Sequence, residues 1–155
     1  VRSFGKLPDR MLYVAGNGPM MEEMQRYVRE HHMENVKFLG YLQKDEMSEK
    51  FYQAKAVIMT SQCYEAFAMT IAEAYSYGVP VIAGRAGNMD GMVQDGITGV
   101  KFTYNSAEDL ADKISAFDAM DLSVLKKNAR AFYAERLRPE DNYQKLIRIY
   151  EDISK

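Results

Sequence analysis

The sequence holds one cysteine, no tryptophan and no long apolar run in its 155 residues. The single cysteine, Cys63, cannot form an intramolecular disulfide, so a reducing, cytoplasmic setting is the default expectation. No apolar stretch approaches the ~20 residues of a membrane-spanning helix, which argues against an integral membrane protein. The first ten residues also lack the apolar core of a signal peptide.

The chain carries no large surplus of charge of either sign. Twenty Lys and Arg against 22 Asp and Glu leave a net charge of −2. A protein that coats nucleic-acid phosphates would need a basic surplus, so nucleic acid is not an expected partner. The hydrophobic fraction of 47% and the charged fraction of 27% are ordinary for a globular domain. We therefore expect one domain over residues 1–155, with C-terminal helices from about residue 121.

Short apolar runs alternate with longer stretches of helical periodicity. The expected strands are Met11–Ala15, Val36–Leu39, Ala56–Met59 and Val79–Ala83, with a shorter one near Val100–Phe102. Strands of this length separated by helices are typical of βαβ units. The sequence therefore predicts an α/β fold with a doubly wound parallel sheet, in which the first four strands are parallel and adjacent. Two further helices are expected at about Leu122–Arg136 and Pro139–Ile153.

Ligands of such sheets bind beyond the carboxyl ends of the strands. Four loops follow the expected strands: Gly16–Pro19, Gly40–Gln43, Thr60–Phe67 and Gly84–Gly91. In the first loop, Gly16 and Gly18 let the backbone approach a ligand closely, and the helix that follows favours an anion. An ordinary strand-to-helix turn would use the same residues.

The loop after the third strand leads into a helix that carries Glu73. The first turn of that helix offers free N–H groups near Ala66, Phe67 and Ala68, which favours a bound phosphate. The neighbours of Glu73 are mainly apolar, so its carboxylate is either half-buried and bonded to hydroxyls or on the solvent face. Carboxylates commonly bind ribose hydroxyls beside a bound phosphate. A nucleotide-sugar site is a plausible reading of this segment.

Other polar residues give weaker indications. His31 and His32 are adjacent and face apart on a helix, which is typical of a solvated helix end rather than a metal site. Asp90 is equally compatible with a substrate contact and with a side chain that caps its loop. Cys63 has no histidine near it in sequence, as an activated nucleophile would require.

Several segments, taken in order, resemble a known family. They are Leu12–Pro19 (LYVAGNGP), Val36–Gly40 (VKFLG), Ser61–Ala68 (SQCYEAFA), Ile71–Ala74 (IAEA), Gly78–Ala83 (GVPVIA) and Asp95–Gly99 (DGITG). This series resembles the C-terminal, donor-binding domain of retaining GT-B glycosyltransferases of the family 4, or group 1, type. Its centre is a pair of glutamates eight residues apart, Glu65 and Glu73.

The resemblance implies a role for each matching residue. The counterpart of Glu73 hydrogen-bonds the ribose, and the counterpart of Glu65, the expected catalytic residue, contacts the transferred sugar. Backbone amides of the loop between them hold the diphosphate or the sugar. Further donor contacts are implied for Gly16, Gly18, Gly40, Tyr41, Leu42, Ser61, Ala66, Phe67 and Ala68. No separate cofactor or metal is expected, since the UDP- or GDP-linked donor is itself a substrate.

The sequence also departs from the family pattern. Ala66 and Ala68 stand where the family usually has glycines, so their methyl groups are expected to narrow the approach to the sugar. Asp90-Gly91 replaces the usual Pro-Glu pair. An Arg and a Lys-Gly that neutralise the diphosphate in the family are not recognisable in Val1–Arg10. The first βα unit and the N-terminal acceptor domain are therefore expected to lie outside this chain.

The resemblance implies the donor-binding half of a retaining hexosyltransferase. Its acceptor would be a glycan or a lipid-linked sugar, bound through the N-terminal domain, as in polysaccharide biosynthesis. The full-length protein would work in the cytoplasm, with peripheral association at the inner face of the membrane as an option. This chain alone is expected to be inactive. The alternative is a non-catalytic module that binds nucleotide sugars or a protein partner.

Overall fold

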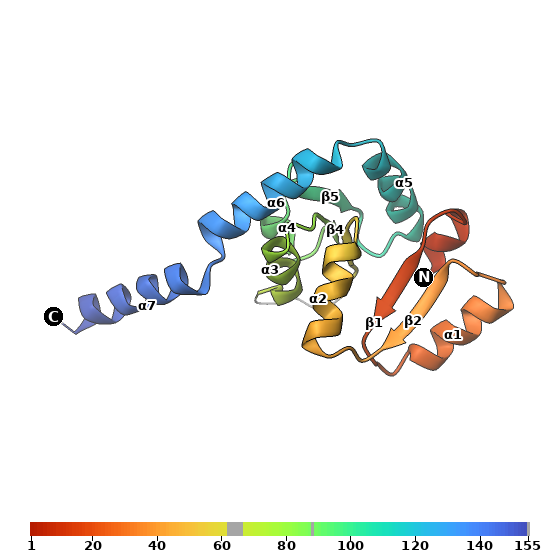
Figure 1. Ribbon diagram of the computed structural model, residues 1–155, viewed down its shortest axis with the longest axis horizontal. Coiled ribbons are helices and arrows are strands. Elements are labelled where there is room, and N and C mark those ends of the chain that lie inside the picture. Colours follow the sequence, from red (N-terminus) through yellow and green to blue (C-terminus); the bar gives the residue numbers. More distant parts are fainter. Residues whose placement is uncertain (62–66, 88, 155) are drawn as a thin grey trace.

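The computed structural model describes residues 1–61, 67–87 and 89–154. Strands and helices alternate along the chain as the apolar pattern predicts (Figure 1). The strands are β1 (Leu12–Ala15), β2 (Val36–Gly40), β3 (Val57–Met59), β4 (Val81–Gly84) and β5 (Gly99–Phe102). The helices among the described residues are α1 (Met21–Glu30), α2 (Lys44–Gln53), α3 (Met69–Ser76), α4 (Met89–Met92), α5 (Ala107–Asp118), α6 (Leu122–Arg136) and α7 (Pro139–Ile153), preceded by a 3-10 helix, η1 (Arg2–Lys6).

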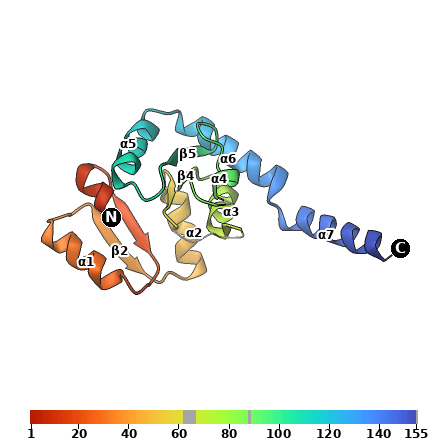
Figure 2. The same cartoon turned by 180° about the vertical axis from the view of Figure 1, so that it is seen from behind.

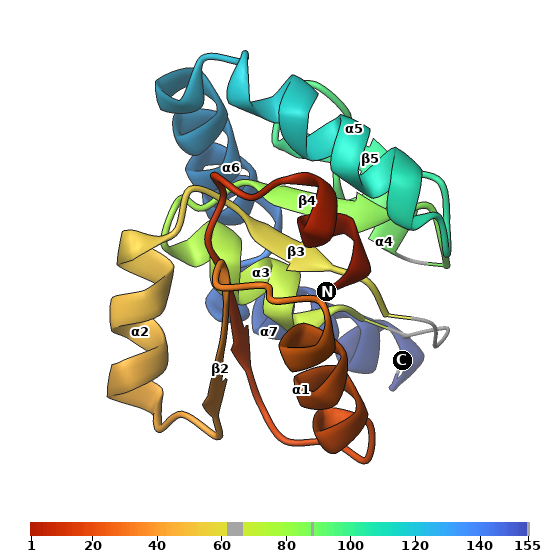
Figure 3. The same ribbon diagram turned by 90° about the vertical axis from the view of Figure 1, so that its right-hand side faces the viewer.

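All strand pairs in the described structure are parallel, which confirms the predicted fold class. β1 pairs with β2, and β4 pairs with β3 on one side and β5 on the other. The expected adjacency is only partly correct, because the strands form two separate sheets rather than one. β1 lies between β2 and the second sheet in two views of the molecule (Figures 1 and 3).

Helices cover both faces of the second sheet. On one face, Val57, Met59, Val81 and Ala83 pack against α3 and α6. On the other face, Ile82, Val100 and Phe102 pack against α5 and η1. Buried apolar side chains thus alternate between two cores, as expected for a parallel sheet that is covered on both sides. The core beneath α3 and α6 is called the first core, and the core beneath α5 and η1 is called the second core.

Tyr75 anchors α3 in the first core through a buried polar network. Its side chain is fully buried, and its hydroxyl lies 2.7 Å from Thr98 Oγ1 and 3.3 Å from the Met92 carbonyl oxygen. Thr98 Oγ1 in turn accepts a bond from the Gln94 N–H. Burial raises the pKa of the Tyr75 hydroxyl to about 12. The network fixes the turn that leads into β5.

Replacing Tyr75 by phenylalanine is expected to cost about 1–2 kcal/mol in the free energy of unfolding, because Thr98 and Met92 lose a buried partner. The raised pKa adds a dependence on pH. Because the pKa of Tyr75 is about 12 in the folded protein and about 10 in the unfolded chain, the buried hydroxyl contributes its full stability below about pH 10. That contribution is lost as the pH rises toward 12. Urea unfolding at pH 8 and pH 11 should therefore show a smaller gap between wild type and Tyr75→Phe at pH 11. Tyr150→Phe, on an exposed side chain of α7, is the control and should match wild type.

Asn35 holds the N-terminal segment against the second core. Its buried side-chain amide donates to the backbone carbonyls of Phe4, Leu7 and Arg10, at 3.0, 2.9 and 3.1 Å. The Leu12 N–H also donates to the Asn35 carbonyl at the start of β1. One side chain therefore holds three carbonyls of η1 and the turn that follows it.

Asn35→Asp is expected to destabilise the fold by about 3 kcal/mol at pH 7, because a buried carboxylate would face three carbonyl oxygens without a donor. The pKa of this carboxyl would be raised above its unfolded value of about 3.9, so the loss should shrink as the pH falls from 7 toward 4 and the buried carboxylate takes up a proton. Urea unfolding at pH 7 and pH 4 measures both effects. Asn128→Asp is the matched control, because Asn128 is only partly buried and its side chain donates to one carbonyl, that of Ile97. Equal stability of the two variants would contradict this role of Asn35.

The C-terminal helix α7 projects away from the body of the molecule (Figures 1 and 2). Its bounds agree with the sequence prediction, with Pro139 at its first turn and no buried residue. Apolar side chains nevertheless follow one another along its surface, and all are exposed: Tyr143, Leu146, Ile149, Tyr150 and Ile153.

Candidate donor-binding site

The first two loops predicted to bind the donor lie next to each other. The Gly16 N–H donates to the Gly40 carbonyl at 2.6 Å, which joins the end of β1 to the end of β2. Both glycines have positive φ, +111° for Gly16 and +68° for Gly40. A side chain on Gly40 would meet Asn17 Oδ1 at 3.7 Å in this unfavourable conformation. The backbone of this corner is therefore bare, as close approach to a ligand requires.

Tyr41 and Leu42 continue from this corner into α2. Tyr41 is 70% exposed, and Leu42 is partly buried. Asp45 and Glu46 lie in the first turn of α2, and Glu46 accepts a bond from the Gln43 N–H. The amino end of α2 is thus already occupied by acidic groups of the chain itself. The exposed Tyr41 ring is the feature here that a ligand could contact.

Glu73 lies on the face of α3 that is turned toward α2. Four residues later on the same face, Tyr77 stacks on Phe51 and its hydroxyl lies 2.7 Å from Ser48 Oγ, both on α2. The apolar neighbours of Glu73 left open whether its carboxylate is half-buried or on the solvent face. In the structure Glu73 is exposed, so it lies on the solvent face. Within the described part of the chain, no hydrogen bond or ion pair engages its carboxylate.

The amino end of α3 differs from those of the other helices that follow strands. The first turns of these helices contain Glu22 and Glu23 in α1, Asp45 and Glu46 in α2, Asp90 in α4, and Glu108 and Asp109 in α5. The first turn of α3 contains no acidic residue, and Ala68 at its N-cap provides no side-chain bond. Acidic side chains in the first turn compete with an external anion for the free N–H groups of a helix. The amino end of α3 has no such side chain, so among these helices it is the most available to bind an anion.

Ala68 and Phe67 stand at this amino end in different surroundings. Ala68 is fully buried within the first core, with Ile71 and Met89 among the members of the same cluster. Its methyl group therefore does not narrow the approach to a sugar, contrary to the sequence expectation. Phe67 is 48% exposed and lies at the surface. Ser61, which follows β3, is partly buried.

Glu65 and Ala66 lie outside the described residues, as does Cys63. The expected roles of Glu65 and Ala66 therefore stay predictions. Of the remaining predicted residues, six lie at or directly after the carboxyl ends of β1, β2 and β3: Gly16, Gly18, Gly40, Tyr41, Leu42 and Ser61. Phe67 and Ala68 directly precede α3, and Glu73 lies within it. Sequence reasoning missed the contact of Ser48 with Tyr77, which orients α3 against α2. The sequence does indicate that Tyr77 shares a helix face with Glu73, because the two residues are four positions apart.

Asp90 belongs to a cluster of charged residues beyond β4 and β5. Its carboxylate lies 3.0 Å from Lys101 Nζ and 3.8 Å from an Arg85 guanidinium nitrogen. Asp95 bonds the same Arg85 at 3.0 Å and accepts the Lys101 N–H at 2.9 Å. Of the two alternatives for Asp90, this arrangement favours a side chain that fixes its loop.

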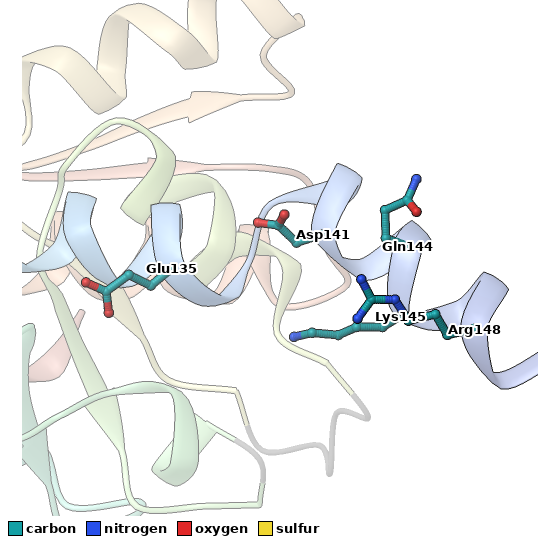
Figure 4. A pocket seen from close by; sticks show the side chains of 5 residues that line it. All are labelled: Glu135, Asp141, Gln144, Lys145 and Arg148. Atoms are coloured by element: carbon teal, nitrogen blue, oxygen red, sulfur yellow. The ribbon is translucent and has the colours of Figure 1, made fainter.

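An open hollow of about 390 Å³ lies at the junction of α6 and α7. Its lining is Glu135, Asp141, Gln144, Lys145 and Arg148, as Figure 4 shows. The junction lies far from β1 and β2, at the opposite end of the molecule (Figure 1). This hollow is therefore separate from the predicted donor-binding residues.

Comparison with known proteins identifies the class of this domain. The family model of glycosyl transferases group 1 matches residues 1–131. The chain therefore belongs to that family of glycosyltransferases, whose members share the GT-B arrangement expected from the motifs.

Curated relatives of this chain are glycosyltransferases of several kinds. It is 32% identical to the sulfoquinovosyl transferase SQD2 of Arabidopsis thaliana over 130 residues, which are 81% of this chain and 25% of that protein. It is 27% identical to the N-acetyl-alpha-D-glucosaminyl L-malate synthase of Bacillus anthracis over 157 residues, 99% of this chain and 40% of that protein. The chain thus spans between a quarter and two fifths of these relatives.

Solved structures share the fold. The Anabaena protein Alr3699/HepE in complex with UDP superposes with a TM-score of 0.87 at 23% identity, over 97% of this chain and 43% of that one. The sucrose-phosphate synthase of Thermosynechococcus elongatus gives a TM-score of 0.86 at 23% identity, over 97% of this chain and 40% of that one. Within the residues that the structure describes, no helix is long and apolar enough to cross a bilayer.

Proposed function

We propose that this chain is the donor-binding part of a retaining glycosyltransferase. The full-length enzyme would transfer a hexose from a nucleoside-diphosphate sugar to a glycan or a lipid-linked acceptor. The acceptor would bind through an N-terminal domain outside this chain. The donor is itself a substrate, and neither a separate cofactor nor a metal ion takes part. The enzyme would act in the cytoplasm, with peripheral contact to the inner face of the membrane.

One arrangement carries this proposal. The amino end of α3 has no acid of its own, and Glu73 stands on the same helix, exposed and turned toward α2. A diphosphate at the helix end would place a ribose within reach of that carboxylate. The bare corner of Gly16 and Gly40 and the Tyr41 ring would meet the base. Charge that develops on the leaving diphosphate would be stabilised by preorganised amides of the α3 amino end.

UDP is the nucleotide we propose. This choice is supported by the solved structure of Alr3699/HepE, which has this fold and is a complex with UDP. Calorimetric titration of the full-length protein with UDP, GDP and ADP tests the choice. Binding of UDP at least tenfold tighter than that of the other two is the expected result, and equal binding of all three would refute base recognition at Tyr41.

The transfer itself is tested with the full-length enzyme and UDP-glucose. Release of UDP that depends on a glycan acceptor, with a product that keeps the α configuration of the donor by NMR, is the expected outcome. A β-linked product would contradict retention. The alternative is a module that binds nucleotide sugars without catalysis, and it predicts UDP binding but no acceptor-dependent release. Two features of the sequence favour that alternative: the alanines at 66 and 68, and the missing basic residues. Burial of the Ala68 methyl bears on only one of the two alanines.

Residues 1–155 alone are expected to show no transferase activity, because the reaction centre would lie between this domain and the acceptor domain. Purified residues 1–155 and the full-length enzyme are compared under the same assay. Weak UDP binding by the isolated domain is compatible with the proposal, since the ribose and phosphate contacts are local. Product formation by residues 1–155 at a rate like that of the full-length enzyme would refute the two-domain site.

A further inference from the structure

An asparagine directly precedes a glycine at the corner between β1 and α1. This pair is Asn17-Gly18, and no other asparagine of the sequence is followed by glycine. The backbone nitrogen of the next residue can attack an asparagine side chain, and glycine hinders this attack least because it has no Cβ atom. The sequence therefore makes Asn17 the asparagine that is most susceptible to deamidation. The surroundings of the pair in the folded protein decide whether the attack can take place.

The structure leaves this pair accessible. Both residues are exposed, and no atom lies within 4 Å of a Cβ atom placed on Gly18. Within the described residues, neither the Gly18 N–H nor the side-chain amide of Asn17 has a hydrogen-bond partner. The Gly18 carbonyl, in contrast, accepts the Met21 N–H at 3.0 Å where α1 begins. The two groups that must react with each other are therefore unprotected.

Two other places in the chain show how a fold can suppress the same chemistry. Asp95 also precedes a glycine, but the Gly96 N–H donates to the Gly99 carbonyl at 2.8 Å. Asn35 is buried, its side-chain amide donates to three backbone carbonyls, and the β-branched Val36 follows it. A bonded N–H protects the first place, and a bonded, buried amide protects the second. The pair at the end of β1 has neither form of protection.

We propose that Asn17 is a site of spontaneous deamidation in the folded protein. The Gly18 nitrogen forms a bond to Asn17 Cγ, and the side-chain nitrogen leaves as ammonia, which takes up the proton of the Gly18 N–H. Water then opens the resulting five-membered imide ring at either of its carbonyls. The products are aspartate at residue 17 and isoaspartate, in which the backbone runs through the former side chain. Each product loses a proton to water and carries a new negative charge.

The new charge lies in the predicted donor-binding corner. Asn17 Oδ1 lies 3.7 Å from the position that a Cβ atom on Gly40 would take, and the Gly16 N–H donates to the Gly40 carbonyl. A carboxylate at residue 17 repels a nucleoside diphosphate. Isoaspartate also lengthens the backbone of this corner by one methylene group. Deamidation therefore weakens donor binding, a consequence that rests on the proposed function, whereas the chemical step does not.

Mass spectrometry of the full-length protein, incubated at mildly alkaline pH, tests the chemical step. Trypsin cleaves after Arg10 and Arg26, and Asn17 is the one asparagine in the peptide between them. Deamidation raises the mass of this peptide by about 1 Da. Its rate in folded protein should be at least about a tenth of the rate in protein unfolded by guanidinium chloride, because the pair is accessible in both. A lower rate would overturn the proposal, since the fold would then protect the pair.

Gly18→Ala tests the attacking nitrogen. The backbone of Gly18 is outside the left-handed region and a methyl group has room there, so the variant should fold. The methyl group hinders the attack, and deamidation of Asn17 in the folded, full-length variant should be at least about 10-fold slower than in wild type. An unchanged rate would refute attack by the backbone and with it the proposed site.

Titration calorimetry of the full-length protein with UDP tests the consequence for the donor. Asn17→Asp carries the charge of the product and should bind UDP at least about 10-fold more weakly than wild type. Asn128→Asp adds the same charge on α6 and should bind UDP like wild type. Equal binding by wild type and Asn17→Asp would refute the effect on the donor. Absence of UDP binding by wild type would instead refute the proposed function, and the peptide rates would still decide whether Asn17 deamidates.

Discussion

Gly99→Ala is expected to abolish stable folding of this domain. A Cβ atom at Gly99 would lie 1.8 Å from the Val81 carbonyl oxygen and 2.8 Å from its carbonyl carbon. Gly99 pairs with Val81 in the β4–β5 ladder, and Val81 is fully buried. Such a distance is far inside van der Waals contact, and the obstacle is backbone rather than a side chain that can turn away. β4 would have to separate from β5.

The expected cost is more than about 4 kcal/mol, a large part of the ~5–15 kcal/mol that stabilises a typical domain. Urea unfolding of the full-length protein, followed by circular dichroism, measures it, and loss of soluble protein is the extreme outcome. Gly91→Ala is the matched control, because no atom lies within 4 Å of a Cβ there. Gly91 lies within α4, where alanine is favoured over glycine, so its variant should be at least as stable as wild type.

The role of Gly99 shows what a motif can and cannot predict. The segment Asp95–Gly99 is one of those that carry the family resemblance, and the structure explains its residues. Gly96 has a φ of +77° and its N–H donates to the Gly99 carbonyl at 2.8 Å. Asp95 accepts the Lys101 N–H, which ties the turn to β5. The sequence shows that Gly96 and Gly99 belong to the motif. It does not show why Gly99 must be glycine, because the Val81 carbonyl that excludes a side chain is 18 residues away and comes close only when β4 pairs with β5.

Local signals fixed most of the helices and strands. The bounds of α6 and α7 agree with the prediction. Ser106 caps α5 by accepting the Asp109 N–H at 3.1 Å, and a serine followed three residues later by an acidic residue is a local signal for a helix start. Gly78, with a φ of +69°, follows α3 at a position where glycine commonly ends a helix. The one-turn helix α4 inside a glycine-rich loop was missed. Four residues are too few for a periodic pattern.

Features that depend on distant contacts were less predictable. Apolar runs predict strands, but not that β1 and β3 fail to pair in the described structure, because pairing depends on segments that are distant in the sequence. The surroundings of Ala68 also depend on distant contacts. The sequence shows that residue 68 carries a methyl group, but not that this group is buried in the first core. For Glu73 the apolar neighbours left two surroundings open. The exposure of Glu73 in the structure decides between them.

Glu73→Gln is expected to weaken donor binding by the full-length enzyme about 10- to 100-fold. The carboxylate is exposed, faces α2 and has no partner within the described residues, so it is available to accept bonds from both ribose hydroxyls. Charge-assisted hydrogen bonds contribute about 1.5–3 kcal/mol, and 1.4 kcal/mol corresponds to a factor of ten. Glutamine keeps the size and one acceptor but loses the charge. Titration calorimetry with UDP measures the change.

The ribose hydroxyls provide the decisive comparison. Wild-type protein should bind 2′,3′-dideoxy-UDP about 10- to 100-fold more weakly than UDP, whereas Glu73→Gln should bind the two ligands with similar affinity, because the partner of the hydroxyls is already weakened. Glu151→Gln, an exposed glutamate on α7, should behave like wild type with both. Unfolding of Glu73→Gln should stay within about 0.5 kcal/mol of wild type, since exposed substitutions rarely cost more. Unchanged UDP affinity in folded Glu73→Gln protein would make Glu73 a surface carboxylate and remove it from the site.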